Sequence, residues 1–284
     1  MIGGNKPHGY TIVEVLIFLA ISSLMFLMAA TFISGKQAAV EFKQGANDIN
    51  TQIRSVVNDV SNGQYPPTVS FSCSAPLGSP PVITTFTTAA QGSNGGCIFL
   101  GKVMQFNVAN DPTAYNVFTV AARQKGPTGA SITSFADAKP VAVDFGSVNL
   151  TEPHRLQNGL VVTKVSQCKL NCIGSNGTPI GSFGFFGSLG NYGLSQSSSP
   201  ESGAQTVVTA SVPGSNFGDS EAVAAANINA QAKNIGPTNI VGNGTYILLC
   251  FKNGNQKGSV SIGGLGGQQF ATLLETGAGV AAAC

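Results

Sequence analysis

The chain has 284 residues, of which 43% are apolar, enough to bury at least one sizeable core in one or two domains. Charged residues make up only 9%, against about 25% in an average soluble domain, and the net charge is +2. This balance gives no overall basic footprint for nucleic acid. Folding could still gather basic side chains into a local patch.

Residues 1–9, MIGGNKPHG, form a short polar leader in which Lys6 is the single fixed positive side chain. Residues 10–34 follow as an apolar run with one charged side chain, Glu14. As a helix this run extends roughly 37 Å, enough to cross a hydrocarbon core of about 30 Å. We expect a transmembrane helix whose N-terminus lies on the cytoplasmic side, because Lys6 precedes the span.

Residues 35–63 are predicted to continue the same helix in amphipathic form. Their apolar residues recur at alternating spacings of four and three, as expected for one stripe on a helix: Phe42, Ala46, Ile49, Ile53, Val56 and Val60. The SNG sequence at 61–63 supplies a stop, with Gly63 suited to a left-handed cap, and two prolines follow. The complete helix would be roughly 80 Å long. Gly45 weakens it unless packing compensates.

The residues at the leader junction resemble those of a known family. Gly9, Tyr10 and Glu14 lie within GYTIVEVL, and this order is similar to the class III signal of type IV prepilins and pseudopilins. The family more often has phenylalanine where Tyr10 stands. The resemblance implies that a prepilin peptidase cleaves between Gly9 and Tyr10, that Tyr10 is N-methylated, and that the mature protein keeps its apolar helix.

The resemblance also implies a role for Glu14, whose carboxylate would be costly within a membrane span. In a filament of staggered parallel helices, Glu14 of one subunit approaches the new α-amino group of Tyr10 on a neighbour. Pairing then relieves two charges together and fixes the register. In a simpler interpretation, Glu14 only reaches the membrane edge.

An ordinary secretory signal is the rival interpretation of the N-terminus. LMAA, ending at Ala30, could serve as its small-residue cleavage site and release a soluble protein. The acid within the apolar run, the weakly basic start and the amphipathic helix that follows without a break argue against it.

Residues 64–284 are predicted to form a β-rich extracytoplasmic domain, so the fold class is α+β, with an antiparallel sheet packed on the long helix. Gly, Pro and Asn-Gly turns separate short apolar segments: CIFLGKVMQFNV, YNVFTVAA, KPVAVDFG, GLVVTKV, SFGFFGSL, AQTVVTASV and YILLCF. The clearest hairpin is TYILLCFKNGNQKGSVSIGG, with Asn253 and Gly254 near its tip. Residues 219–233 indicate a short helix capped by Asp219 or Ser220.

The cysteines indicate an oxidising compartment. Cys73, Cys97, Cys168, Cys172, Cys250 and Cys284 form an even set, which suggests up to three disulfides. Many connectivities are possible, and we favour nearest neighbours: Cys73 with Cys97, Cys168 with Cys172, and Cys250 with Cys284. Some of these residues, above all the close pair at 168 and 172, could instead be buried thiols. The CKLNC motif lacks the second ligand pair of a zinc site, so we predict no metal.

No catalytic motif or cofactor fingerprint is present in the sequence. His154 could be combined with Asp144 and a serine into a triad, but it is more simply a loop residue after Pro153. The GGLGG sequence at 263–267 is not followed by Gly-Lys-Ser/Thr, and a turn or bulge explains it better than a phosphate site. We predict no catalytic residue, no enzymatic activity and no cofactor.

The second half of the chain loosely resembles the H-type minor pseudopilins of type II secretion. The similarity lies in the order of LQNGLVVTKV, FGFFGSLG and ILLCFKNGNQKGSVSI. By analogy with type IV pilins, a bond between Cys250 and Cys284 would staple the C-terminal region to the sheet.

The sequence therefore predicts a structural filament subunit. It is stored in the cytoplasmic membrane, processed, and built into a cell-surface pilus or pseudopilus through its N-terminal helix, with prepilin peptidase, other pilin subunits and the pilus assembly machinery as partners. The sequence does not distinguish between a major pilin, a minor pilin and a pseudopilin. The alternatives are a secreted or membrane-anchored binding protein and an extracytoplasmic hydrolase.

Overall fold

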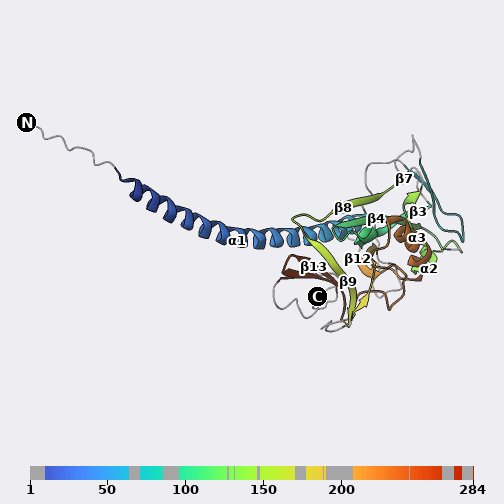
Figure 1. Ribbon diagram of the computed structural model, residues 1–284. Helices are drawn as coiled ribbons and strands as arrows, with labels where there is room; N and C mark the ends of the chain where they lie inside the picture. The colour runs from blue at the N-terminus through green and yellow to red at the C-terminus, as the bar shows by residue number, and fades with distance from the viewer. Residues whose placement is uncertain are drawn as a thin grey trace, which may run out of the picture.

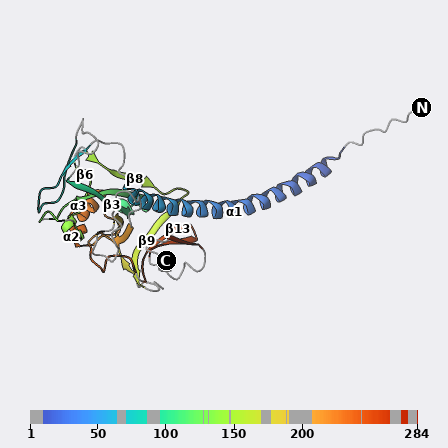
Figure 2. The ribbon, with the colours of Figure 1, turned by 180° about the vertical axis from the view of Figure 1, so that it is seen from behind.

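The computed structural model has one long helix that projects from a β-rich domain, which confirms the predicted α+β class (Figure 1). The structure describes residues 10–63, 71–85, 96–126, 128–130, 132–145, 148–169, 177–187, 189, 207–242, 244–263, 272–276 and 284. The two views show that the N-terminal half of the helix stands clear of the domain while the other half lies against it (Figures 1 and 2).

Helix α1 spans Ile12–Ser61 without interruption, about 75 Å at 1.5 Å per residue. Thr11 caps its start, since the side chain of Thr11 accepts a hydrogen bond from the backbone N–H of Glu14 at 3.3 Å. The predicted stop is confirmed. Asn62 is the C-cap residue, and Gly63 has a φ of 62°, a left-handed conformation that favours glycine.

The larger sheet has six antiparallel strands in the order β12 (Val207–Ser211), β11 (Ser182–Gly187), β3 (Cys97–Phe106), β4 (Ala114–Arg123) and β5 (Val141–Ala142), and β8 (Thr151–Arg155) also pairs with β4. The two faces of this sheet line two separate hydrophobic cores, because side chains alternate between the faces along each strand. Met104 and Phe106 pack with α1. Val103 packs on the opposite side.

Short helical elements pack on this opposite side of the sheet and contribute residues to the second core. They are α2 (Phe135–Ala138), α3 (Glu221–Gln231) and the 3-10 turn η2 (Ala232–Asn234). The predicted helix at 219–233 is therefore confirmed, with Ser220 as its N-cap. A further 3-10 turn, η1 (Val108–Asn110), connects β3 to β4.

The second sheet has five antiparallel strands in the order β10 (Thr178–Pro179), β9 (Val161–Lys169), β13 (Thr245–Asn253), β14 (Gln256–Ile262) and β15 (Thr272–Thr276). The predicted hairpin is confirmed as β13 and β14, with Asn253 opposite Gln256. Ile247, Leu249 and Phe251 join the core around α1, whereas Leu248 lies on the other face. Both sheets thus share the C-terminal half of α1 as one wall of a common core.

Two small hairpins complete the described structure: β1 (Phe71–Ser74) with β2 (Val82–Thr85), and β6 (Asp144–Phe145) with β7 (Val148–Asn149). Each apolar segment predicted to be a strand contains at least one, and KPVAVDFG contains both β5 and β6, whereas β1, β2, β7, β8, β10 and β15 were not predicted. The GGLGG sequence and the CKLNC loop fall outside the described residues, except Gly263 and the first two residues of CKLNC.

Candidate functional site

The N-terminal half of α1 is an apolar surface that the rest of the molecule leaves uncovered. The large apolar side chains described between residues 10 and 28 are more than two-fifths exposed, with Tyr10 at 81%, Phe18 at 71% and Phe26 at 74%. Its most apolar window has a mean hydropathy of 2.5, and none of that window is buried. By length and composition, this half of the helix could cross a membrane.

The predicted processing and assembly residues lie at the tip of this surface. Tyr10 precedes the helix, and Glu14 lies in its first turn with its side chain exposed. A carboxylate is favourable there because the partial positive charge of a helix N-terminus attracts it. Gly9 lies outside the described residues.

The C-terminal half of α1 has the opposite environment. All six residues of the predicted stripe are buried, and Ala46 and Ile53 are completely so. Gly45 lets a neighbouring loop approach, because a β-carbon at this position would lie 3.3 Å from the backbone oxygen of Gln157. The glycine that weakens the isolated helix thus allows close packing between α1 and the loop after β8.

A buried lysine joins this half of the helix to the domain. Lys102 on β3 is 4% exposed, and its Nζ lies 2.9 Å from Asp59 Oδ2 on α1 and 3.2 Å from Glu152 Oε1 on β8. Removing one partner from a buried ion pair leaves a poorly solvated charge. Lys102 therefore stabilises the packing of α1 against β3 and β8.

The charge on Glu152 is further stabilised by His154, whose Nε2 lies 3.6 Å from Glu152 Oε2. His154 is the largest cause that lowers the pKa of Glu152; burial acts against it, and Lys102 adds to the lowering. The His154 ring stacks on Tyr115, with 4.9 Å between ring centroids. Burial, with a smaller contribution from Glu152, raises the pKa of Tyr115 to about 12.

The prediction that His154 is a loop residue is wrong, because it lies in β8 opposite Tyr115 of β4. This strand was not predicted because it contains Pro153, and proline is depleted in strands. Asp144, the other residue considered for a triad, begins β6, and its side chain is outside the described set. Within the described residues no three His, Cys, Asp or Glu side chains gather as metal ligands.

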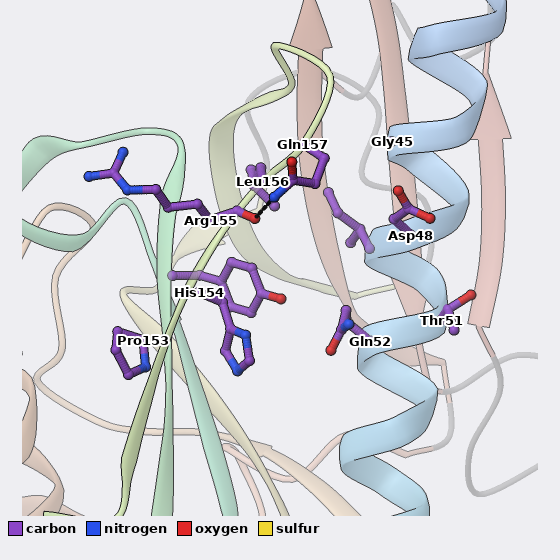
Figure 3. Close-up of a pocket in the computed structure, with 11 residues that line it drawn as sticks. Gly45, Asp48, Thr51, Gln52, Pro153, His154, Arg155, Leu156 and Gln157 are labelled. Carbon is purple, nitrogen blue, oxygen red and sulfur yellow. Dashed lines mark hydrogen bonds between the residues drawn. The ribbon is translucent and has the colours of Figure 1, made fainter.

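A groove lies between α1 and β8 (Figure 3). Its volume is about 420 Å³. One wall is a face of the helix, the other is β8 with the loop that follows it, and Tyr115 of β4 also lines it. Nothing in the sequence predicted the groove, since it depends on how β8 is placed beside the helix.

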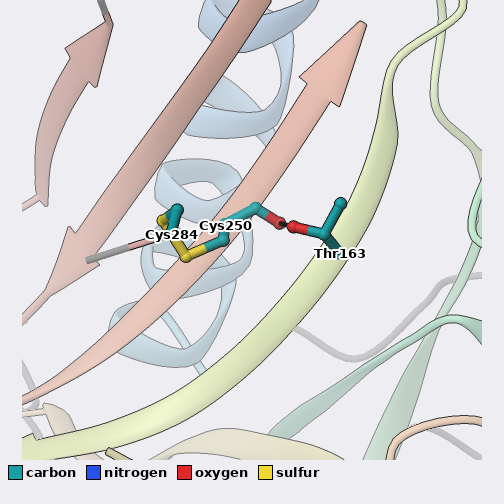
Figure 4. The surroundings of a disulfide bond; sticks show 3 residues. All are labelled: Thr163, Cys250 and Cys284. Carbon is teal, nitrogen blue, oxygen red and sulfur yellow. Dashed lines mark hydrogen bonds between the residues drawn. A yellow bond between two sulfur atoms is a disulfide. The ribbon is translucent and has the colours of Figure 1, made fainter. Parts of the chain in front are cut away.

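Two of the predicted disulfides are confirmed: Cys73 with Cys97, and Cys250 with Cys284. The first ties the β1–β2 hairpin to the start of β3, and the second ties the last residue to β13. Figure 4 shows the second bond beside Thr163 of β9, whose hydroxyl donates to the Cys250 carbonyl at 3.3 Å. Cys172 lies outside the described residues, so its pairing with Cys168 stays a prediction.

A comparison with protein-family models, curated proteins and solved structures gives no match to this chain. Lys102 and Glu152, which join the helix to the domain, were not predicted from the sequence. The available signal was a lysine within LGKVMQF, since a charge inside an apolar strand needs a partner when it is buried.

Proposed function

We propose that this chain is a subunit of a type IV pilus or a related secretion filament, stored in the membrane and assembled through its N-terminal helix. One observation carries the proposal: a single unbroken helix has an exposed apolar half and a half buried in the domain, and the exposed half begins next to Gly9, Tyr10 and Glu14.

The exposed half of α1 requires an apolar environment. Burying apolar surface is worth about 25 cal/mol per Å², so a surface of this kind is unstable in water and marks a membrane or protein contact. Before assembly the membrane supplies that environment. After assembly the equivalent helices of neighbouring subunits supply it, and helix packing replaces lipid.

Glu14 supplies the polar contact in this arrangement. Cleavage after Gly9 gives Tyr10 an α-amino group, and a staggered neighbour brings that amine near the Glu14 carboxylate. Two charges that are each costly in an apolar bundle then stabilise one another, so this pairing selects one register among many apolar packings.

The continuity of the helix favours this proposal over an ordinary secretory signal. Residues on both sides of Ala30 belong to one helix, and the chain passes into the buried half without a break. Cleavage after Ala30 would cut this helix within its span and remove Glu14 together with the signal, so the acid would have no role in the mature protein. In the proposal, the disulfide-bonded domain faces the oxidising side and the leader faces the cytoplasm.

The test is intact-mass and N-terminal analysis of the protein from its native membrane and from shed material. A mature chain that begins at N-methylated Tyr10 supports the proposal. A mature chain that begins near Thr31 contradicts it and identifies a secreted protein.

A further inference from the structure

The groove between α1 and β8 has two walls that carry different polar groups. On α1, Asp48, Thr51 and Gln52 line it. On β8 and its following loop, His154 and Gln157 line it. Its volume of about 420 Å³ lies in the lower part of the range for small-molecule sites. The two walls come from segments about a hundred residues apart in the sequence. Folding of the domain therefore forms the groove before any ligand binds.

Several polar groups of the groove are available to a ligand. Within the described part of the chain, the side chains of Asp48, Thr51 and Gln52 form no hydrogen bond or ion pair. Tyr115 is 5% exposed, and its hydroxyl also has no partner there. A hydroxyl on a largely buried side chain gains stability from a partner, and a ligand with hydroxyl groups can both donate to these residues and accept from them.

The charge of the lining disfavours an anionic ligand. The Arg155 guanidinium points away from the helix, and its Nη1 lies 3.1 Å from Asp111 Oδ2 (Figure 3). His154 lies beside Glu152. Asp48 is then the only charged group in the groove without a described counter-charge, so phosphates and acidic sugars would meet repulsion.

The groove also offers a flat ring surface. His154 stacks on Tyr115 with an angle of 14° between the rings, and a third of the His154 side chain is exposed. The stack fixes the imidazole in one orientation. The apolar C–H face of a sugar ring packs well against such a surface, while its hydroxyl groups reach amides and carboxylates at the edge.

We propose that this groove binds an uncharged, hydroxyl-rich ligand of the carbohydrate class, held between the α1 residues Thr51 and Gln52 and the Tyr115–His154 stack. The site gives the domain a recognition role in addition to its structural role. The proposal does not depend on filament assembly, because it concerns the folded domain whatever the mature N-terminus is.

The experiment is saturation-transfer NMR on the full chain in a micelle of lauryldimethylamine oxide, a detergent without a sugar headgroup. The probes are methyl α-D-glucopyranoside, methyl α-D-galactopyranoside, methyl α-D-mannopyranoside and N-acetyl-D-glucosamine, each added separately. We expect transfer to at least one of them. Gln52→Ala and Tyr115→Phe each remove one hydrogen-bonding group, and we expect each to weaken that probe's affinity about 5-fold.

Gln44→Ala is the matched control, because Gln44 is an exposed glutamine on the same helix that does not line the groove. It should bind like the wild type, and thermal unfolding should show that all three variants fold. Absence of transfer to all four sugars would overturn the proposal, as would equal binding by Gln52→Ala and Gln44→Ala. Binding of Nα-acetyl-lysine amide alone, abolished by Asp48→Asn, would show a cation site instead.

Discussion

The two halves of α1 have the same secondary structure and opposite environments. In the N-terminal half, Ile21 is 53% exposed, whereas Ile53 in the other half is completely buried. The first half is apolar on every side, and the second is apolar along one stripe. A single apolar stripe is sufficient where the chain folds back to cover it, whereas a helix that is apolar on every side needs a partner outside the chain.

The polar residues of the two halves differ in the same way. Lys102 and Glu152 meet Asp59 within one chain, so that network is complete in a single subunit. Glu14 forms no ion pair within the described part of the chain. In our proposal the partner of Glu14 comes from another subunit. Mutations in the first half should therefore affect assembly, and mutations in the second half should affect the stability of the domain.

The largest effect is expected at the leader junction. Gly9→Glu places a bulky charge at the proposed cleavage site and should block processing completely, leaving the full-length chain in the membrane. Gly4→Glu makes the same change within the leader and should be processed. Immunoblotting and intact mass measure both, and mature protein from Gly9→Glu would contradict the proposed junction.

Glu14→Ala should separate membrane storage from assembly. We expect normal processing and a filament yield reduced several-fold, because the register contact is lost while the helix stays apolar. Glu275→Ala, at an exposed glutamate on β15, is the control and should assemble normally. Filaments sheared from cells and quantified by immunoblotting give the yield, and an unchanged yield for Glu14→Ala would refute the role of this acid.

The buried and exposed halves should differ in their contribution to domain stability. Ile53→Ala removes a completely buried side chain and should lower the free energy of unfolding by about 2–5 kcal/mol. Ile21→Ala should change it by less than about 0.5 kcal/mol, because Ile21 is 53% exposed and the described residues of the domain leave that half uncovered. Denaturant unfolding in detergent measures both, and equal losses would show that the exposed half contributes to the domain core.

Replacing the buried Lys102 should lower the free energy of unfolding by less than replacing the core residue Ile53. Lys102→Met keeps most of the volume but removes the cation from Asp59 and leaves Glu152 with His154 alone, so we expect a loss of about 1–3 kcal/mol in the free energy of unfolding. The acids are about one-third exposed, which limits the loss. Lys257→Met, at an exposed position of β14, should be neutral. A neutral Lys102→Met would mean that the network adds no stability.

The pH dependence of this network should be the smallest effect. Because His154 and Lys102 lower the pKa of Glu152 in the folded state, the contribution to stability is present above the ordinary glutamate pKa of 4.5 and is lost as pH falls through the lowered value. Thermal unfolding midpoints should therefore drop on acidification below that pH. Glu152→Gln should make the drop shallower, and an identical pH profile in this variant would assign the drop to other carboxylates.

Local patterns in the sequence predicted much of the fold. The stripe on α1, its stop at Gly63, the short helix with a cap at Asp219 or Ser220, and the β13–β14 hairpin each depend on residues within a few positions of one another. Nearest-neighbour pairing also predicted two disulfides correctly. The sequence did not predict β8, since Pro153 and a polar composition conceal a strand that forms only because β4 is available to pair with it.

Local sequence patterns are enough to predict the long helix, its change from apolar to amphipathic, and the β-rich composition of the rest, because periodicity and turn chemistry act over short distances. Three features depend on long-range packing: which half of α1 is covered, which acids contact Lys102, and the stacking of His154 on Tyr115 beside the helix. These contacts join segments from about 40 to more than 100 residues apart. Their geometry follows from strand order and from the packing of two sheets on one helix, which no local pattern specifies.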